Sequence, residues 1–146
     1  MKMPVLFVGH GSPMNAIEDN EFSRTWRALG EALPRPRAIL AVSAHWYVSG
    51  TRVNAAAQMR QIYDMYGFPQ PLYQLKYPAP GAPELAAQVM ELLPEAVQDG
   101  SWGIDHGSWS VLCHMFPAAD VPVTQLSIDH NAPPDAHYRM RQALKP

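Results

Sequence analysis

Four apolar residues near the start of the chain run directly into a histidine that is held between two glycines. The stretch reads Val5-Leu6-Phe7-Val8-Gly9-His10-Gly11-Ser12-Pro13. An unbroken apolar run of this kind is typical of a strand buried on both faces, and the glycines and the proline that follow allow a sharp turn. The sequence therefore predicts a buried strand over 5–8 that delivers the imidazole of His10 into a turn.

A second apolar run ends in a histidine in the same way. Residues 38–42 are all apolar and are followed by Ser43, Ala44 and His45. Between the two runs, apolar residues recur at helical spacing over 22–33, and prolines then end the helix. Strand, helix and strand predict a right-handed βαβ unit with two parallel neighbouring strands. Because ligands bind at the carboxyl edge of open α/β sheets, we expect His10 and His45 to converge there.

Composition limits the classes of function. The 146 residues are 47% hydrophobic, which is enough for the core of one domain. Eleven basic and thirteen acidic residues give a net charge of −2 without a basic run, so we expect no nucleic-acid partner. A single cysteine, Cys113, and the lack of an apolar run of membrane length predict a cytoplasmic protein with no membrane partner.

The rest of the chain adds further helices and strands. The predicted segments are a turn at 49–50 with a short strand after it, a long functional connection over 56–81, a helix from Pro83, a strand over 121–128 and a helix from Pro134. Ser108 has the residue type of a helix N-cap, which would place His106 just before a helix. The predicted fold class is α/β. In such a fold we would expect another strand after the last predicted helix, where this sequence ends.

Three of the six histidines lie in settings typical of functional sites. His10 and His45 follow predicted buried strands, and His106 lies in a glycine-containing loop. Neutral imidazoles that converge in a cleft are the commonest metal ligands. The other three lack such a setting and are interpreted as structural or surface residues: His114, His130 and His137.

A catalytic metal site normally has three protein ligands, so two histidines are too few. Asp64, Asp105 or Glu18 could supply a carboxylate, and no spacing selects one of them. Nucleophilic catalysis is disfavoured, because the segment around Ser12 lacks the Gly-x-Ser-x-Gly elbow and Cys113 falls inside an amphipathic helix. The residues alone predict an incomplete mononuclear metal site in an α/β domain, with a metal-dependent hydrolase as a weaker alternative.

Five sequence motifs then stand in order along the chain: Gly9–Met14, Ser43–Trp46, Asp64 with Gly67–Pro69, Tyr77–Gly81 and Trp102–Trp109. In this order, over essentially all of the chain, they closely resemble the motifs of the class III (LigB-type) extradiol ring-cleavage dioxygenases. Within that family the match is nearest to the 4,5-DOPA extradiol dioxygenase-like subgroup.

The resemblance implies a three-layer α/β domain around a mostly parallel central sheet, of which residues 1–146 would be the N-terminal portion. It implies opening of catecholic, DOPA-like rings with O2, using a mononuclear non-haem Fe(II) or Zn(II). The expected partners are a small aromatic diol and O2. By resemblance, His10 and His45 are metal ligands, His106 is the catalytic histidine that contacts substrate or oxygen and transfers a proton, and Asp64 and Phe68 belong to the substrate pocket.

The resemblance also implies that something is missing. In the family, a further histidine-bearing strand and the last metal ligand lie C-terminal to the region that aligns with this chain. We therefore expect a C-terminally truncated domain that lacks a third ligand and a base and is inactive or incomplete. The alternative is a non-catalytic, truncated metal-binding or interaction domain. In either case an exposed sheet edge would favour self-association.

Overall fold

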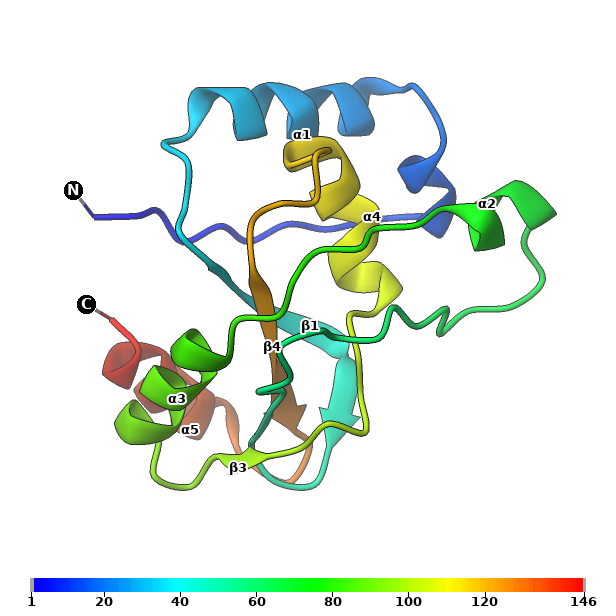
Figure 1. Cartoon of the computed structure of the whole chain (residues 1–146). Helices are drawn as coiled ribbons and strands as arrows, with labels where there is room; N and C mark the ends of the chain where they lie inside the picture. The colour runs from blue at the N-terminus through cyan, green and yellow to red at the C-terminus, as the bar shows by residue number, and fades with distance from the viewer. Residues whose placement is uncertain (1, 146) are drawn as a thin grey trace.

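The computed structural model describes residues 2–145 and has a four-stranded sheet between helices (Figure 1). The strand order is β1-β4-β2-β3. β1 (Ile39–Val48) runs parallel to β4 (Val123–Asp129), β2 (Arg52–Val53) runs antiparallel to β4, and β3 (Val97–Gln98) runs parallel to β2. The predicted α/β class with a mostly parallel central sheet is confirmed.

Helices cover both faces of this sheet. α1 (Glu21–Ala32), α4 (His106–Met115) and the short 3-10 helix η1 (Pro13–Ala16) lie on one face, and α3 (Pro83–Leu92) and α5 (Pro134–Ala143) lie on the other (Figure 1). A short helix, α2 (Gln70–Gln74), interrupts the long connection before α3. The helices predicted over 22–33 and from the two prolines are confirmed. No helix in the described part of the chain is long and apolar enough to span a membrane.

The core forms because successive side chains of a strand point to opposite faces. On one face, Ile39 and Val123 pack in a cluster with Trp109 of α4. On the other face, Leu40 and Leu126 pack in a cluster with the α3 residues. β4 is therefore covered on both faces and is buried from Val123 to Ser127, although Thr124, Gln125 and Ser127 are polar. β1, at the edge of the sheet, is only partly buried.

The strand predicted over 5–8 is wrong. No sheet strand among the described residues pairs with this segment, and Val5 and Phe7 are exposed at 82% and 103%. Only Val8 is drawn inward, where it packs against the cluster of Trp26, Val111 and Met115. An apolar run forms a strand only when a neighbouring strand accepts its hydrogen bonds, and here β1 pairs in parallel with β4 instead. The expected βαβ unit is thus replaced by the β1–β4 pair.

β1 contains a large irregularity at the position of the predicted histidine. Val42 pairs with Leu126 and Tyr47 pairs with Ile128, so the segment from Ser43 to Trp46 faces Ser127 alone. Extra residues of this kind bend a strand and aim its side chains in new directions, and such bulges are frequent next to active sites. His45 therefore lies within β1, on the bulge, and not beyond the end of a strand as the sequence suggested.

The start of α4 also differs from the prediction. The helix begins at His106 with Asp105 at the N-cap position, so Ser108 lies inside the helix. The Ser108 hydroxyl caps nothing and donates a buried hydrogen bond to Gln125 Oε1 at 3.0 Å. His106 is consequently the first residue of the helix, where its side chain is fixed by the helix and by the loop before it.

The long connection after β2 is ordered by backbone pairing with the loop that precedes α4. Ile62 N donates to Ile104 O and Ile104 N donates to Arg60 O, both at 2.9 Å. Gly103 is required at this crossing, since a Cβ there would lie 1.8 Å from the carbonyl oxygen of Arg60. The pairing brings the loop that carries Asp64 to the N-terminus of α4.

Candidate metal centre

Three histidines from three separate segments meet at one place. His10 follows the N-terminal extended segment, His45 lies on the bulge of β1, and His106 begins α4. Each ring offers one nitrogen, and these atoms all lie within 4.8 Å of one another. The Nε2 atoms of His10 and His45 are 2.8 Å apart. The convergence of His10 and His45 predicted from the sequence is present, although the N-terminal strand on which it was based is not.

His10 is held by its backbone and by its neighbours. Asn15 Nδ2 donates to the carbonyl oxygen of His10 at 3.0 Å, which fixes the turn between the extended segment and η1. Burial, and next the charges of His106 and His45, lower the pKa of His10 below its ordinary value. His10 is therefore biased toward the neutral form, which is the form that binds metals.

His45 is held by the crowded start of α4. A Cβ on Gly107 would lie 2.7 Å from Cδ2 of His45 and 3.0 Å from Oγ of Ser43. Only glycine therefore allows the helix to approach the bulge this closely. The Ser43 hydroxyl also accepts a hydrogen bond from the backbone N–H of His45 at 3.2 Å, which fixes the bulge itself.

His106 is held by a carboxylate. Asp64 Oδ1 lies 2.8 Å from His106 Nδ1 and accepts a second hydrogen bond from the backbone N–H of His106 at 2.9 Å. Burial alone would raise the pKa of Asp64, but the hydrogen bonds from His106 outweigh it and hold that pKa below its ordinary value. Asp64 thus stays ionised and orients the imidazole ring.

Asp105 is the buried acceptor that joins the elements around the site. Its Oδ1 accepts from Ser43 Oγ at 2.8 Å, and its Oδ2 accepts from Trp102 Nε1 at 2.9 Å and from Gln125 Nε2 at 2.5 Å. These partners belong to β1, to the loop before α4 and to β4. Asp105 is fully buried, and both of its carboxylate oxygens accept hydrogen bonds from the protein. It therefore holds the elements around the site together and is not itself a ligand.

The donor set fits a divalent transition metal. Imidazole nitrogen suits Zn(II) and Fe(II), and two nitrogens bound at about 2.1 Å to one ion lie roughly 3.0 Å apart in octahedral and roughly 3.4 Å apart in tetrahedral geometry. The 2.8 Å separation between His10 Nε2 and His45 Nε2 is slightly shorter, so the two rings need only a small displacement to bind one ion. His10 Nδ1 is buried without a hydrogen-bond partner among residues 2–145, so Nε2 is the nitrogen through which His10 makes its polar contact.

The other residues proposed from the sequence lie elsewhere or do other things. Phe68 packs against the hydrophobic cluster that contains Leu72 and Trp109, and its backbone N–H donates to the Tyr73 hydroxyl. The three histidines that were interpreted as structural or surface residues each lie within hydrogen-bond distance of a nearby oxygen atom. The partners are the carbonyl of Asn15 for His114, the side chain of Asn131 for His130 and the carbonyl of Asp129 for His137. Burial raises the pKa of the Cys113 thiol to about 12, which leaves it unreactive.

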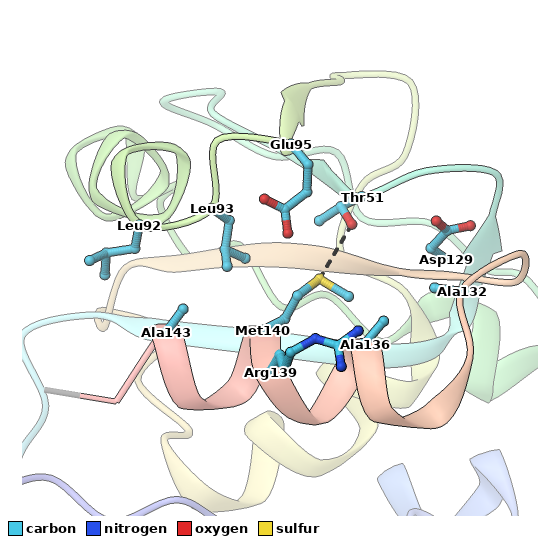
Figure 2. Close-up of a pocket in the computed structure, with 10 residues that line it drawn as sticks. All are labelled: Thr51, Leu92, Leu93, Glu95, Asp129, Ala132, Ala136, Arg139, Met140 and Ala143. Carbon is cyan, nitrogen blue, oxygen red and sulfur yellow. Dashed lines mark hydrogen bonds between the residues drawn. The ribbon is translucent and has the colours of Figure 1, made fainter.

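A groove of about 460 Å³ lies between α3 and α5, away from the histidines (Figure 2). Met140 projects into it from α5, and the Thr51 hydroxyl donates to the Met140 sulfur at 3.5 Å. Arg139 and Glu95 are among the residues that line it (Figure 2). No histidine is among the residues that line it, so this groove and the histidine cluster are separate features.

Comparison with known proteins places this chain in a family. The family model described as "Catalytic LigB subunit of aromatic ring-opening dioxygenase" matches residues 4–146. A 4,5-DOPA dioxygenase extradiol of Escherichia coli K12 is 52% identical over 146 residues, covering 98% of this chain and 54% of the relative. A protein of the same name from Beta vulgaris is 42% identical, covering 96% of this chain and 55% of the relative.

A solved structure agrees with these sequence matches. The crystal structure of an uncharacterized protein from Escherichia coli K12 superposes with a TM-score of 0.74 at 46% identity, covering 91% of this chain and 50% of that chain. This chain therefore spans about half the length of the relatives that it matches. With the family model matching almost every residue, the chain belongs to the LigB family of catalytic subunits of aromatic ring-opening dioxygenases.

Proposed function

We propose that this chain is the metal-binding portion of an extradiol dioxygenase that opens catecholic, DOPA-like rings with O2. The observation that carries the proposal is the meeting of His10 and His45, whose Nε2 atoms lie 2.8 Å apart beside His106. Relatives that share 52% and 42% identity are named 4,5-DOPA dioxygenase extradiol, which supports a catechol as the substrate. The small aromatic diol and O2 are thus the proposed reactants.

In this proposal His10 and His45 hold the metal, as Fe(II) or Zn(II). A metal ion bound there would neutralise the charge of a deprotonated diol and orient the reactants. His106 lies beside this pair, and its ring centroid is 4.2 Å from that of His45. Asp64 engages Nδ1 of His106, so Nε2 is left to accept a proton from a substrate hydroxyl.

Asp64 and Phe68 have different proposed places. Asp64 acts on the site by its hydrogen bond to His106. Any contact between Asp64 and a substrate would therefore be made by a carboxylate that already binds His106. Phe68 belongs to the partly buried residues around the neighbouring hydrophobic cluster, which supports a role in the wall behind the Asp64 loop. Both residues are carried by the connection between β2 and α2.

Oxygen consumption tests the proposal. A form of the protein extended at its C-terminus to the length of the relatives is used, because this chain spans about half of that length and is expected to be inactive or incomplete alone. It is loaded with Fe(II) under anaerobic conditions and then mixed with oxygenated buffer and a panel of catechols that includes DOPA. Ring opening should consume one O2 per catechol and require the metal. His45→Ala should abolish the uptake, and His130→Ala, a histidine outside the cluster, should leave it unchanged. If the loaded, extended protein takes up no O2 with any of the catechols, the proposal is overturned.

The alternative proposal is a non-catalytic metal-binding or interaction domain. It is favoured by two observations, namely the half-length match to the relatives and the exposed apolar residues Val5 and Phe7. The same experiment separates the two proposals, because this alternative predicts metal binding that depends on His10 and His45 without consumption of O2.

A further inference from the structure

The groove between α3 and α5 combines apolar walls with two side chains of opposite charge (Figure 2). We propose that it is a binding site for a free α-amino acid with an apolar side chain. In this site Glu95 holds the ammonium group, Arg139 holds the carboxylate, and Leu93 and Met140 contact the side chain of the ligand. The proposal is independent of the proposed function, because none of the clustered histidines lines the groove.

The size and the lining of the groove suit a small organic molecule. Its volume of about 460 Å³ falls within the range of roughly 300 to 1,000 Å³ that small-molecule pockets occupy. Leu92 and Leu93 line it from the end of α3, and Ala136 and Met140 line it from α5. A methionine side chain is flexible and adapts to ligands of different outline. The groove can therefore accept an apolar side chain without requiring one particular shape.

Glu95 provides the acceptor for an ammonium group. It follows α3, and its carboxylate points toward α5 (Figure 2). The ion pairs formed within residues 2–145 involve other acids, so Glu95 has no cationic partner there. Asp129, the other acid that lines the groove, already accepts hydrogen bonds from the backbone of Asn131 and Gly50, which lower its pKa. Glu95 is thus the acid of the groove that is open to a ligand.

Arg139 provides the donors for a carboxylate. One of its nitrogens, Nη1, donates to Asp135 Oδ2 at 2.6 Å. A guanidinium carries five N–H donors in a fixed fork, so this bond leaves others for a ligand. The two side chains are also 66% and 65% exposed, and an ion pair in such a setting is weak. A ligand carboxylate can therefore bind Arg139 beside Asp135 or in its place.

Charge complementarity decides which molecule fits. Glu95 and Arg139 line the same groove but belong to different segments, and no ion pair joins them within the described part of the chain. A simple amine would pair with Glu95 and leave the positive charge of Arg139 beside it, and a simple carboxylate would have the converse problem. An α-amino acid carries both charges on adjacent groups and directs its side chain away from them. It is the small ligand that matches the two charges and the apolar walls together.

A ligand in this groove would also restrict α5. None of the α5 residues is buried, and the helix packs against the core cluster of α3 through Met140. A molecule that contacts both Glu95 and Arg139 adds a connection between α5 and the segment after α3. Since a ligand stabilises the conformation that it binds, we expect local opening of α5 to become rarer.

NMR of methionine methyl groups tests the proposal with L-phenylalanine as the probe. The chain has eight methionines, and the signal of Met140 is assigned as the one that Met140→Leu removes. L-Phenylalanine should shift this signal in a saturable way and slow amide hydrogen exchange in α5. Phenethylamine and 3-phenylpropionate each lack one charged group, so each should bind at least about 10-fold more weakly.

Matched substitutions identify the two charged contacts. Glu95→Gln and Arg139→Gln should each weaken the binding of L-phenylalanine by at least about 10-fold, because each removes one charge-assisted contact. Glu91→Gln changes an exposed acid of α3 that does not line the groove, and should stay within about twofold of wild type. Asp135→Asn keeps Arg139 and removes its competing partner, so binding should be unchanged or tighter.

Three outcomes would overturn the proposal. The first is a Met140 signal that L-phenylalanine does not shift. The second is equal binding of phenethylamine, which would mean that the groove recognises an amine alone. The third is a shift that follows the protein concentration and not the amino acid, which would mean that a second copy of the chain covers the groove. No metal and no turnover enter these measurements, so their failure would leave the proposed function untouched.

Discussion

At the scale of single residues, Gly107 controls the distance between α4 and the bulge of β1. An added Cβ would lie 2.7 Å from His45 Cδ2 and 3.0 Å from Ser43 Oγ, so Gly107→Ala should push His45 out of place. We expect zinc affinity to fall roughly 10-fold, the low end of the cost of losing an orienting contact. The control is Gly9→Ala, beside His10, where an added Cβ meets no atom within 4 Å. Equal losses in both variants would contradict this account.

Asp105 gives a second prediction at this scale, on stability. Asp105→Asn replaces an acceptor-only group that receives hydrogen bonds from Ser43, Trp102 and Gln125. The amide nitrogen would face a donor, so we expect a loss of about 3 kcal/mol in the free energy of unfolding. Urea denaturation measures it. Asp120→Asn, which alters an exposed ion pair with Arg35, should leave the free energy of unfolding nearly unchanged.

Some site residues were predictable from the sequence and others were not. His10, His45 and His106 were identified as candidates from the sequence. Each lies beside a glycine or just after an apolar run, and both are signals that a local stretch of sequence contains. The contact between Asp64 and His106 joins positions 42 residues apart, and no local pattern encodes it. Gln125 was missed for a related reason, since a polar residue inside a predicted strand is recognised as part of a site only when its buried partners are known.

At the scale of elements, an ion pair between Arg52 and Asp99 connects β2 to the segment after β3. Arg52 lies 2.9 Å from Asp99, and hydrogen bonds from Ser101, followed by Arg52, lower the pKa of Asp99 below its ordinary value. A carboxyl whose pKa is lower in the folded state stabilises the fold above its unfolded pKa, and this contribution is lost as the pH falls through the folded pKa.

We therefore expect wild type to lose more stability between pH 7 and pH 3 than Asp99→Asn does. The difference should be small, since the Arg52 side chain is 37% exposed and solvent screens the pair. Urea denaturation of both proteins at the two pH values measures it. An identical loss in the two proteins would show that the pair contributes nothing.

The elements differ in how far the sequence determined them. The helices over 21–32, 83–92 and 134–143 were predicted because capping residues, prolines and helical periodicity are local signals. The strand over 5–8 was predicted wrongly, since its apolar residues satisfy the pattern while the pairing depends on distant residues. The bulge at 43–46 depends on register with β4, which a single strand does not encode.

At the scale of the whole molecule, the exposed apolar residues predict self-association. Phe7 is 103% exposed and Val5 is 82% exposed, and Val42, on β1 at the outer position of the sheet, is 56% exposed. Unpaired strand edges and apolar patches favour contact with a second copy of the chain. Sedimentation velocity over a range of concentrations should therefore show reversible association of the wild-type protein.

The residues responsible are identified by matched substitutions. Phe7→Glu should shift the protein toward monomer, because it places a charge in the apolar segment. Tyr66→Glu changes an equally accessible aromatic residue, 92% exposed, on the loop after Asp64, and should leave the association as in wild type. A wild-type protein that stays monomeric throughout would contradict the prediction.

The unpaired N-terminal segment has a consequence for the thermodynamics of ion binding. His45 and His106 sit on elements whose backbone is already bonded, whereas His10 follows a segment with no strand partner among residues 2–145. If His10 and His45 hold an ion as proposed, binding must restrict the chain before His10, whereas the chain around His45 is already restricted by its strand. The entropy of ion binding will therefore depend on how strongly residues 4–9 are already restricted in the ion-free protein. A contact that restricts these residues before the ion binds will raise the ion affinity, even if it involves no ligand.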